Sequence, residues 1–208
     1  MSYPAQSPRL WLEPLTIESH SQEFFALWQN PENLTYINVA AHTNLDSARQ
    51  FMQTILPNST NPDIDKFAML LRPVVENEQP WTNGMDRPKM IGLVGTNRWS
   101  EQGLETGYIL DVKYWGRGYA GEALGAFLGV YWELIERRTV QRLVAKCQPA
   151  NIASRKVWMR AGARYEGEIV KSSKGERGEV ELECWYLKRP AVGAENLEEG
   201  KGVNGKEK

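Results

Sequence analysis

The fold follows most directly from one segment of this 208-residue chain, Asp111-Val112-Lys113-Tyr114-Trp115-Gly116-Arg117-Gly118-Tyr119-Ala120-Gly121-Glu122-Ala123-Leu124. A strand pattern ends near Val112, glycines follow at 116 and 118, and a helical pattern begins near Ala120. A helix start offers backbone N–H groups without intrahelical partners and a partial positive charge, which together suit a phosphate. The charge alone contributes only about 0.3–1 kcal/mol at an exposed site, so several convergent N–H groups must supply most of the binding.

Two phosphate-binding patterns fit this segment, alongside a purely structural glycine turn. Gly116, Gly118 and Gly121 match the dinucleotide fingerprint G-x-G-x-x-G. That fingerprint requires an acidic residue at the end of the next strand, whereas Glu136 falls in the last turn of the predicted helix. A dinucleotide fold would also continue with βαβ units, but a helix and two antiparallel strand patterns follow here. Both features disfavour a dinucleotide site.

The segment more closely resembles the pyrophosphate loop of GNAT N-acetyltransferases, usually written Q/R-x-x-G-x-G/A. Trp115 stands where that family usually has Gln or Arg, and Tyr119-Ala120-x-Glu122-Ala123-Leu124 is similar to the RimJ/RimL-like (ribosomal-protein-alanine acetyltransferase) branch. Two further segments resemble the same family. They are Asn151-x-x-Ser154, with Gly162 eleven residues after the asparagine, and Glu105-Thr106-Gly107-Tyr108.

The hydrophobic periodicity predicts strands and helices in an order that agrees with this resemblance. Strands are predicted at 9–15, 65–71, 90–96, 106–112, 142–147, 164–170 and 179–187, the last with its glutamates on one wet face. Helices are predicted around 24–28, from a capping box at 43–46, over 120–137, and from 151 to 162. The resemblance implies an α/β (mixed α+β) GNAT fold. It has a central, mostly antiparallel mixed sheet, splayed between its fourth and fifth strands, with about four helices on its faces.

Composition bounds the domain organisation and the classes of partner. Residues 9–189 are expected to form one acetyltransferase domain, after an N-terminal extension at 1–8 and before a disordered Gly-, Glu- and Lys-rich tail at 190–208. The formal net charge of −1 gives no clustered basic excess, so no nucleic-acid partner is expected. No apolar run reaches membrane-span length and no signal layout opens the chain, which predicts a cytoplasmic or nuclear protein without a membrane partner. Cys147 and Cys184 lack metal-ligand spacing, so they are expected to be reduced core residues, with no metal.

The resemblance also implies acetyl-CoA as the co-substrate. Main-chain amides from Gly116 to Ala120 would hold its pyrophosphate, and the strand edge at 110–112 would pair with the pantetheine arm. Asn151 fits equally well as a plain helix N-cap, and Ser154 fits a bond within its own helix. The candidate cofactor-binding residues are Leu110, Asp111, Val112, Trp115, Gly116, Arg117, Gly118, Tyr119, Ala120, Asn151 and Ser154.

The implied reaction is direct attack of an amine on the thioester, supported by positioning and backbone N–H groups. Many relatives carry an acidic tyrosine seven residues after the motif asparagine, but this chain has Trp158, whose indole is not a useful acid. Glu105 is the leading candidate base, with a solvated strand-end carboxylate as the alternative. His42 is the second candidate, with an ordinary surface histidine as the alternative. Candidate residues of the acceptor pocket are Tyr36, Asn38 and Trp99.

The sequence therefore predicts an enzyme that moves an acetyl group to a primary amine, either a protein N-terminus or a small amine. Trp158 motivates one alternative, a non-catalytic acyl-CoA-binding or sensing module of the same fold. An ordinary lysine amine is only about 0.1% neutral at pH 7.4, whereas an α-amine is roughly a quarter neutral, so an N-terminal acceptor needs less help from a base. The acceptor's identity, the role of loop 72–89, and the choice between monomer and homodimer stay open.

Overall fold

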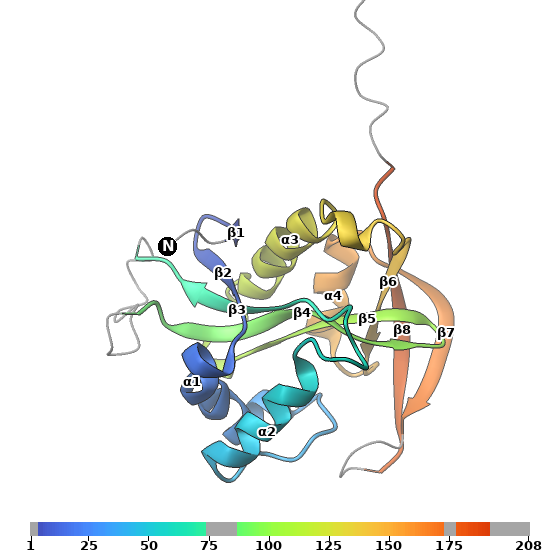
Figure 1. Ribbon diagram of the computed structural model, residues 1–208. Helices are drawn as coiled ribbons and strands as arrows, with labels where there is room; N and C mark the ends of the chain where they lie inside the picture. Colours follow the sequence, from blue (N-terminus) through green and yellow to red (C-terminus); the bar gives the residue numbers. More distant parts are fainter. Residues whose placement is uncertain (1–3, 74–86, 173–177, 192–208) are drawn as a thin grey trace, which may run out of the picture.

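The computed structural model describes residues 4–73, 87–172 and 178–191, which build one mixed sheet flanked by helices (Figure 1). Within these residues the strand order is β1-β2-β3-β4-β5-β6-β8-β7. Every neighbouring pair is antiparallel except β5 and β6, which are parallel. The strands are β1 (Ala5–Gln6), β2 (Leu10–Pro14), β3 (Lys66–Leu71), β4 (Met90–Ser100), β5 (Gly103–Leu110), β6 (Arg142–Cys147), β7 (Arg164–Ser172) and β8 (Val180–Lys188). The predicted mixed, mostly antiparallel α/β fold is confirmed.

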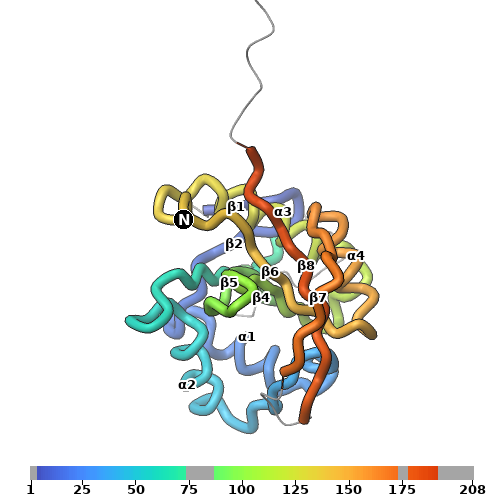
Figure 2. The backbone as a smooth tube through the Cα atoms, turned by 90° about the vertical axis from the view of Figure 1, so that its right-hand side faces the viewer, coloured from blue at the N-terminus to red at the C-terminus, as the bar shows by residue number. Residues whose placement is uncertain are grey.

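Helices cover both faces of the sheet, as two views at right angles show (Figures 1 and 2). On one face lie α1 (Ile17–Gln29), the 3₁₀ turn η1 (Pro31–Leu34) and α2 (Leu45–Ile55). On the other lie α3 (Tyr119–Tyr131) and α4 (Ile152–Arg160). Each face has its own hydrophobic core, one centred on Phe24, Trp28 and Met52 and the other on Phe127, Tyr131 and Trp158. Burial of such large aromatic side chains supplies most of the driving force for this packing.

The sheet opens between β5 and β6. These strands pair only at Leu104–Leu143, Glu105–Val144 and Thr106–Ala145. Beyond Thr106, β5 continues along β4 as far as Leu110, while β6 continues along β8. Figure 1 shows β6, β8 and β7 turning away from β4 and β5. This is the predicted splay, numbered one strand later because β1 adds part of the predicted extension 1–8 to the sheet.

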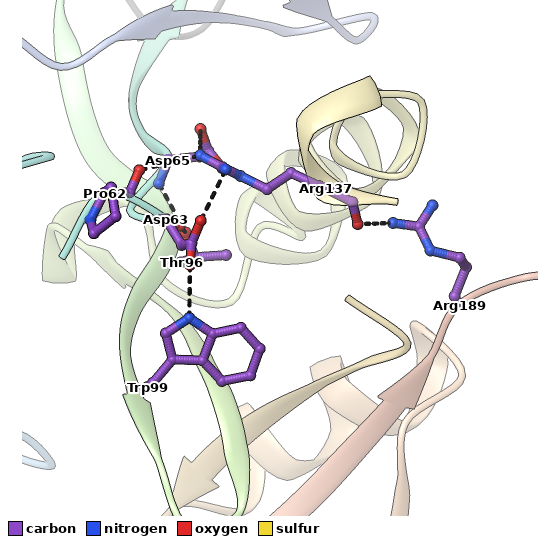
Figure 3. A network of polar contacts seen from close by, with 7 residues as sticks. All are labelled: Pro62, Asp63, Asp65, Thr96, Trp99, Arg137 and Arg189. Atoms are coloured by element: carbon purple, nitrogen blue, oxygen red, sulfur yellow. Dashed lines mark hydrogen bonds and ion pairs between the residues drawn. The ribbon is translucent and has the colours of Figure 1, made fainter. Parts of the chain in front are cut away.

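The predicted helix at 120–137 is wrong at its end. α3 stops at Tyr131, and a separate 3₁₀ turn, η3 (Ile135–Arg137), follows it. Ile135, which continued the helical periodicity, is 67% exposed. A distant cation holds the chain after α3, because Arg189 donates to the carbonyls of Trp132 (2.6 Å), Val140 (2.9 Å) and Arg137. Figure 3 shows the bond to Arg137. A helix that continued to Arg137 would have paired the Trp132 carbonyl with the Glu136 amide, and Arg189 takes that carbonyl instead.

Three local predictions also need correction. The N-cap of α2 is Asn44, whose Oδ1 accepts from the Ser47 N–H at 2.8 Å, and not a capping box ending at Asp46. The strand predicted at 106–112 ends at Leu110, and Val112–Tyr114 form the 3₁₀ turn η2. Glu183 does not lie on a wet face, because it is buried and pairs with the Arg155 guanidinium at 3.0 Å.

The remaining predictions on cysteines and on the terminal segments differ in outcome. Cys147 and Cys184 are both free and buried, as expected. No helix among residues 4–73, 87–172 and 178–191 is long and apolar enough to cross a membrane. In the same ranges no group of three or more His, Cys, Asp and Glu side chains is placed to hold a metal ion. Most of loop 72–89 and most of the tail 190–208 lie outside the described residues.

Candidate functional site

The glycine turn before α3 presents main-chain donors. Gly116 and Gly118 have φ values of 75° and 84°, a left-handed conformation that glycine adopts without steric cost. α3 begins directly after them at Tyr119, and no side chain of residues 4–73, 87–172 or 178–191 caps its start. The amides of Gly116, Gly118, Tyr119, Ala120 and Gly121 have no hydrogen-bond partner within the described part of the chain. Five donors at a helix start form the arrangement that suits an anion.

The N-terminal segment holds this turn in place through Glu122. The Glu122 carboxylate accepts from the Ser7 hydroxyl (2.6 Å), the Arg9 amide (2.8 Å) and Arg9 Nε (2.7 Å). Burial alone would raise the pKa of Glu122, but these hydrogen bonds outweigh burial and lower it. The Arg9 guanidinium also stacks 4.3 Å from the Tyr119 ring centroid and donates to the Arg117 carbonyl at 3.1 Å. The contacts join residues more than 100 positions apart, so local sequence patterns could not reveal them.

Parts of the predicted strand edge at 110–112 already have partners in the protein. The Trp115 indole N–H donates to the Leu110 carbonyl at 2.7 Å. The Val112 amide donates to Asn33 Oδ1 at 2.7 Å, and the Asp111 amide donates to the Ile91 carbonyl at 2.9 Å. Asn33 was not singled out by the sequence. It is buried, and its own Nδ2 donates to the Leu27 carbonyl, which ties α1 to the end of β5.

The start of α4 and the middle of β5 meet beside the opening in the sheet. Asn151 caps α4, because its Oδ1 accepts from the Ser154 amide at 3.0 Å. The Tyr108 hydroxyl donates to Ser154 Oγ at 3.2 Å, and the Tyr108 ring centroid lies 5.7 Å from that of Trp158. Burial raises the pKa of Tyr108 to about 12. The protonated phenol of Tyr108 therefore lies next to Trp158. Trp158 itself occupies the position at which the resemblance leads one to expect a tyrosine.

A cavity of about 750 Å³ lies on the α1 and α2 side of the sheet. Its apolar wall includes Trp28, Phe51 and Ile109, from α1, α2 and β5. It also reaches Gly107 and Tyr108, which follow the last β5–β6 pair. The cavity thus extends to the point where the sheet opens. Its polar side chains include Lys66, Asn97, Arg98, Glu105, Lys146 and Gln148.

Two of the three predicted pocket residues line this cavity. Tyr36 and Asn38 belong to the segment between η1 and α2. Gln148 Nε2 donates to the Tyr36 carbonyl at 3.2 Å, and Asn38 Nδ2 donates to the Gly178 carbonyl at 3.1 Å. These bonds fix the segment against the end of β6 and the start of β8.

Trp99 and His42 lie outside the set of lining residues. The Trp99 indole N–H donates to Asp63 at 2.8 Å, on the side of the hairpin that faces Arg137, and the residue is 51% exposed (Figure 3). The His42 ring packs behind the cavity wall, with centroids 6.2 Å from Trp28 and 5.2 Å from Phe51. Burial lowers the pKa of His42.

Glu105 lines the cavity with both of its oxygens next to cations. Oε1 accepts from Lys146 Nζ at 2.8 Å, and Oε2 lies 3.9 Å from Arg98. The side chain is only 13% exposed, so it is not a solvated strand-end carboxylate. Lys66 on β3, which the sequence did not single out, lines the same cavity. Its Nζ donates to Asn97 Oδ1 at 2.5 Å, and burial lowers its pKa to about 7.

A splayed mixed sheet, with a donor-rich turn on one face and a cavity on the other, is the architecture of an N-acetyltransferase. Residues 9–164 match the family model described as "Acetyltransferase (GNAT) domain", which spans most of the chain. The chain therefore belongs to the GNAT family and is an acetyltransferase. This match also decides between the two phosphate-binding patterns in the sequence, because the glycine turn belongs to a GNAT domain and not to a dinucleotide fold.

Similar proteins agree with this assignment. The chain is 25% identical to the uncharacterized N-acetyltransferase p20 of Bacillus licheniformis over 191 residues, which cover 88% of this chain and 98% of p20. A GNAT-family acetyltransferase structure from Bacillus anthracis has a TM-score of 0.66 at 19% identity, covering 89% of this chain and 98% of that one. RimL, a ribosomal L7/L12 alpha-N-protein acetyltransferase, also has a TM-score of 0.66 at 19% identity, covering 88% and 91%. The fold shared with RimL is in keeping with the RimJ/RimL-like resemblance of the sequence.

Proposed function

We propose that this enzyme transfers the acetyl group of acetyl-CoA directly to a primary amine, within a complex that holds both substrates at once. GNAT acetyltransferases use acetyl-CoA as the co-substrate. The observation that carries the proposal is the opening between β5 and β6, which lies between the donor-rich turn on the α3 face and the cavity on the α1 face. A long, narrow cofactor bound at the turn would reach the cavity through this opening.

Named residues of this chain fit the cofactor. The five unpartnered amides of the glycine turn suit its diphosphate, because charge-assisted bonds to main-chain N–H groups are about twice as strong as neutral ones. On the side that faces β6, the β5 edge from Gly107 to Ile109 pairs with no described strand and suits the amides of the pantetheine arm. Asn151 is proposed to serve both expected roles. Its Oδ1 caps α4, and its Nδ2, which has no partner among the residues described, would bind the cofactor. Trp115 is proposed to shape the turn through its bond to Leu110.

The cavity is proposed to hold the acceptor. Its volume of about 750 Å³ suits a small amine or the first residues of a peptide N-terminus. Tyr36, Asn38 and Glu105 would contact the acceptor. Catalysis then comes mainly from holding the amine against the thioester, with main-chain N–H groups stabilising the developing oxyanion. The protonated Tyr108 hydroxyl, next to Ser154, would stabilise the leaving thiolate.

A thiol-release assay tests this proposal. Acetyl-CoA is incubated with the enzyme and a panel of small amines, amino acids and short peptides with free N-termini. The expected result is release of coenzyme A that matches the acetylated product mole for mole by mass spectrometry. If acetyl-CoA binds in calorimetry but no amine yields thiol, the chain is a binding or sensing module, and the proposal is wrong.

A further inference from the structure

The first observation is where the Lys66 amine lies. Lys66 on β3 pairs with Gly95 on β4, which in turn pairs with Gly107 on β5. Both positions after Lys66 in this row are glycines, so the row itself places no side chain between Lys66 and the edge of the opening. The Asn97 side chain links the two positions. Its Oδ1 lies 2.5 Å from Lys66 Nζ, and its Nδ2 lies 3.6 Å from where a Cβ atom would stand if Gly107 had a side chain. The amine is therefore one amide group away from Gly107, the first β5 residue beyond the last β5–β6 pair.

The second observation is the absence of a counter-ion near Lys66. Within the described part of the chain, no carboxylate lies within ion-pair distance of Nζ, whose one hydrogen-bond partner is the neutral Asn97 amide. The lysine is only 6% exposed, although it lines a cavity. Buried lysines are rare unless paired, because an ammonium in a low-dielectric site is costly.

The groups that face Lys66 from the surrounding elements explain why it has no counter-ion. Among the described residues, the one carboxylate of the cavity wall is that of Glu105 on β5. It is engaged by Arg98 from β4 and Lys146 from β6. The α1 and α2 side chains on the opposite wall are uncharged. The other titratable side chains lining the cavity are Tyr36 and Tyr108.

We infer that Lys66 is the general base of the reaction, taking the proton from the ammonium form of the acceptor amine. This inference rests on the proposed acetyl transfer and assigns its proton acceptor. A base works best when its pKa lies near the working pH. Burial lowers the pKa of Lys66 to about 7, so much of this amine is neutral at pH 7.4, against about 0.1% for an ordinary lysine.

The proton inventory of the step balances. One proton passes from the acceptor's ammonium to Lys66 Nζ, which leaves a neutral acceptor amine. Its nitrogen bonds to the thioester carbonyl carbon, the carbon–sulfur bond breaks, and the sulfur leaves as a thiolate. The second proton lost by the nitrogen converts the thiolate to the free thiol. Lys66 then releases its proton to water, so each turnover gives one amide, one thiol and one proton.

Two substitutions at Lys66 separate a base from a fixed cation. With the best amine from the thiol-release screen, Lys66→Met and Lys66→Arg should both lower kcat/KM by roughly 100-fold or more, because neither side chain accepts a proton near neutral pH. Acetyl-CoA affinity, measured by calorimetry, should change less than about threefold, since the glycine turn lies on the other face of the sheet. Near-normal activity of Lys66→Arg would show that Lys66 serves only as a positive charge and would overturn the inference.

Asn97→Asp provides a second variant that keeps the shape of the site. A carboxylate next to Nζ favours the ammonium form of Lys66. The acid-side limb of the pH profile of kcat/KM should therefore shift to higher pH by about one unit or more, and activity should recover at high pH. An unmoved limb would contradict the inference. Mass spectrometry of the enzyme after incubation with acetyl-CoA alone should show no acetylation of Lys66. An acetylated Lys66 would mean that its amine acts as a nucleophile and not as a base. If the wild type acetylates no amine, the proposed function is wrong. If the wild type and the Lys66 variants are equally active, only the assignment of Lys66 as the base is wrong.

Discussion

Replacing Lys66 with methionine should stabilise the folded protein at pH 6, and the gain should shrink as the pH rises. In the folded state burial lowers the lysine pKa from 10.5 to about 7. The unfolded chain therefore binds more protons than the folded chain between these two values, so this lysine makes the wild type more stable as the pH rises through that window. Below about pH 7 the full cost of the buried ammonium is present. Methionine has a similar length and no charge, so its variant lacks this pH dependence.

The size of the effect follows from the same pKa difference. At about 1.36 kcal/mol per pKa unit, a fall from 10.5 to about 7 corresponds to about 5 kcal/mol. Loss of the hydrogen bond to Asn97 removes about 1 kcal/mol of this gain. Relaxation of the site around the ammonium reduces the gain further. The free energy of unfolding of Lys66→Met at pH 6 is therefore expected to exceed that of the wild type by about 2–4 kcal/mol. The gain should then fall by up to about 1.4 kcal/mol per pH unit between pH 7 and 9.

Urea unfolding followed by tryptophan fluorescence at pH 6, 7, 8 and 9 measures this difference directly. Lys146→Met is the matched control, because Lys146 lines the same cavity but has Glu105 as its partner at 2.8 Å. Its loss leaves that carboxylate with one fewer partner, so this variant should be destabilised by about 1–3 kcal/mol. A Lys66→Met variant that is less stable than the wild type at pH 6, or equally stabilised at all four pH values, would refute a buried amine without a counter-ion.

Three further variants test the turn and the framework around it. Gly118→Ala forces a side chain into a φ of 84° at a cost of about 1–2 kcal/mol and should weaken acetyl-CoA binding at least tenfold in calorimetry. The control Gly125→Ala, in α3, should leave the affinity unchanged. Equal affinities of the two variants would contradict cofactor binding by the glycine turn. Glu122→Gln should cost about 1–3 kcal/mol in urea unfolding at pH 7. Because the folded-state pKa of Glu122 is lowered, that cost should fade as the pH drops below about 4, and a difference independent of pH would be contrary to the hydrogen bonds described. Arg137→Met removes the partner of Asp63 and Asp65 in Figure 3 and should lower the free energy of unfolding by about 1–3 kcal/mol; an unchanged Tm would show that the network contributes nothing.

The sequence predicted the local features of the fold well, because these depend on neighbours along the chain. The glycine pair before α3, the Asn151 cap and the left-handed Gly162 are all set by residue type at adjacent positions. The end of α3 could not be predicted in this way. Helical periodicity continued to Ile135, but the carbonyls of the following turn are held by Arg189, more than 50 residues away.

The candidate site was predicted in part for the same reason. Glu105 was named from a local resemblance, and the structure places it in the cavity wall. Lys66 was not named, because a lysine at a strand start is normally exposed, and only the folded sheet shows that it is buried. The Arg9–Glu122 anchor and the Asn33–Val112 bond were likewise invisible, since each joins segments far apart in the chain.

The most direct measurement of the central claim compares acetyl-CoA with S-acetylpantetheine, which carries the thioester but lacks the diphosphate, in calorimetry on the intact chain. Several charge-assisted bonds from the glycine turn, each worth about 1.5–3 kcal/mol, should make acetyl-CoA bind at least about 100-fold more tightly. Gly118→Ala should narrow that difference. Equal affinity for the two compounds, or no acetyl-CoA binding at high micromolar concentration, would contradict the assignment of the turn and of the acetyl transfer built on it.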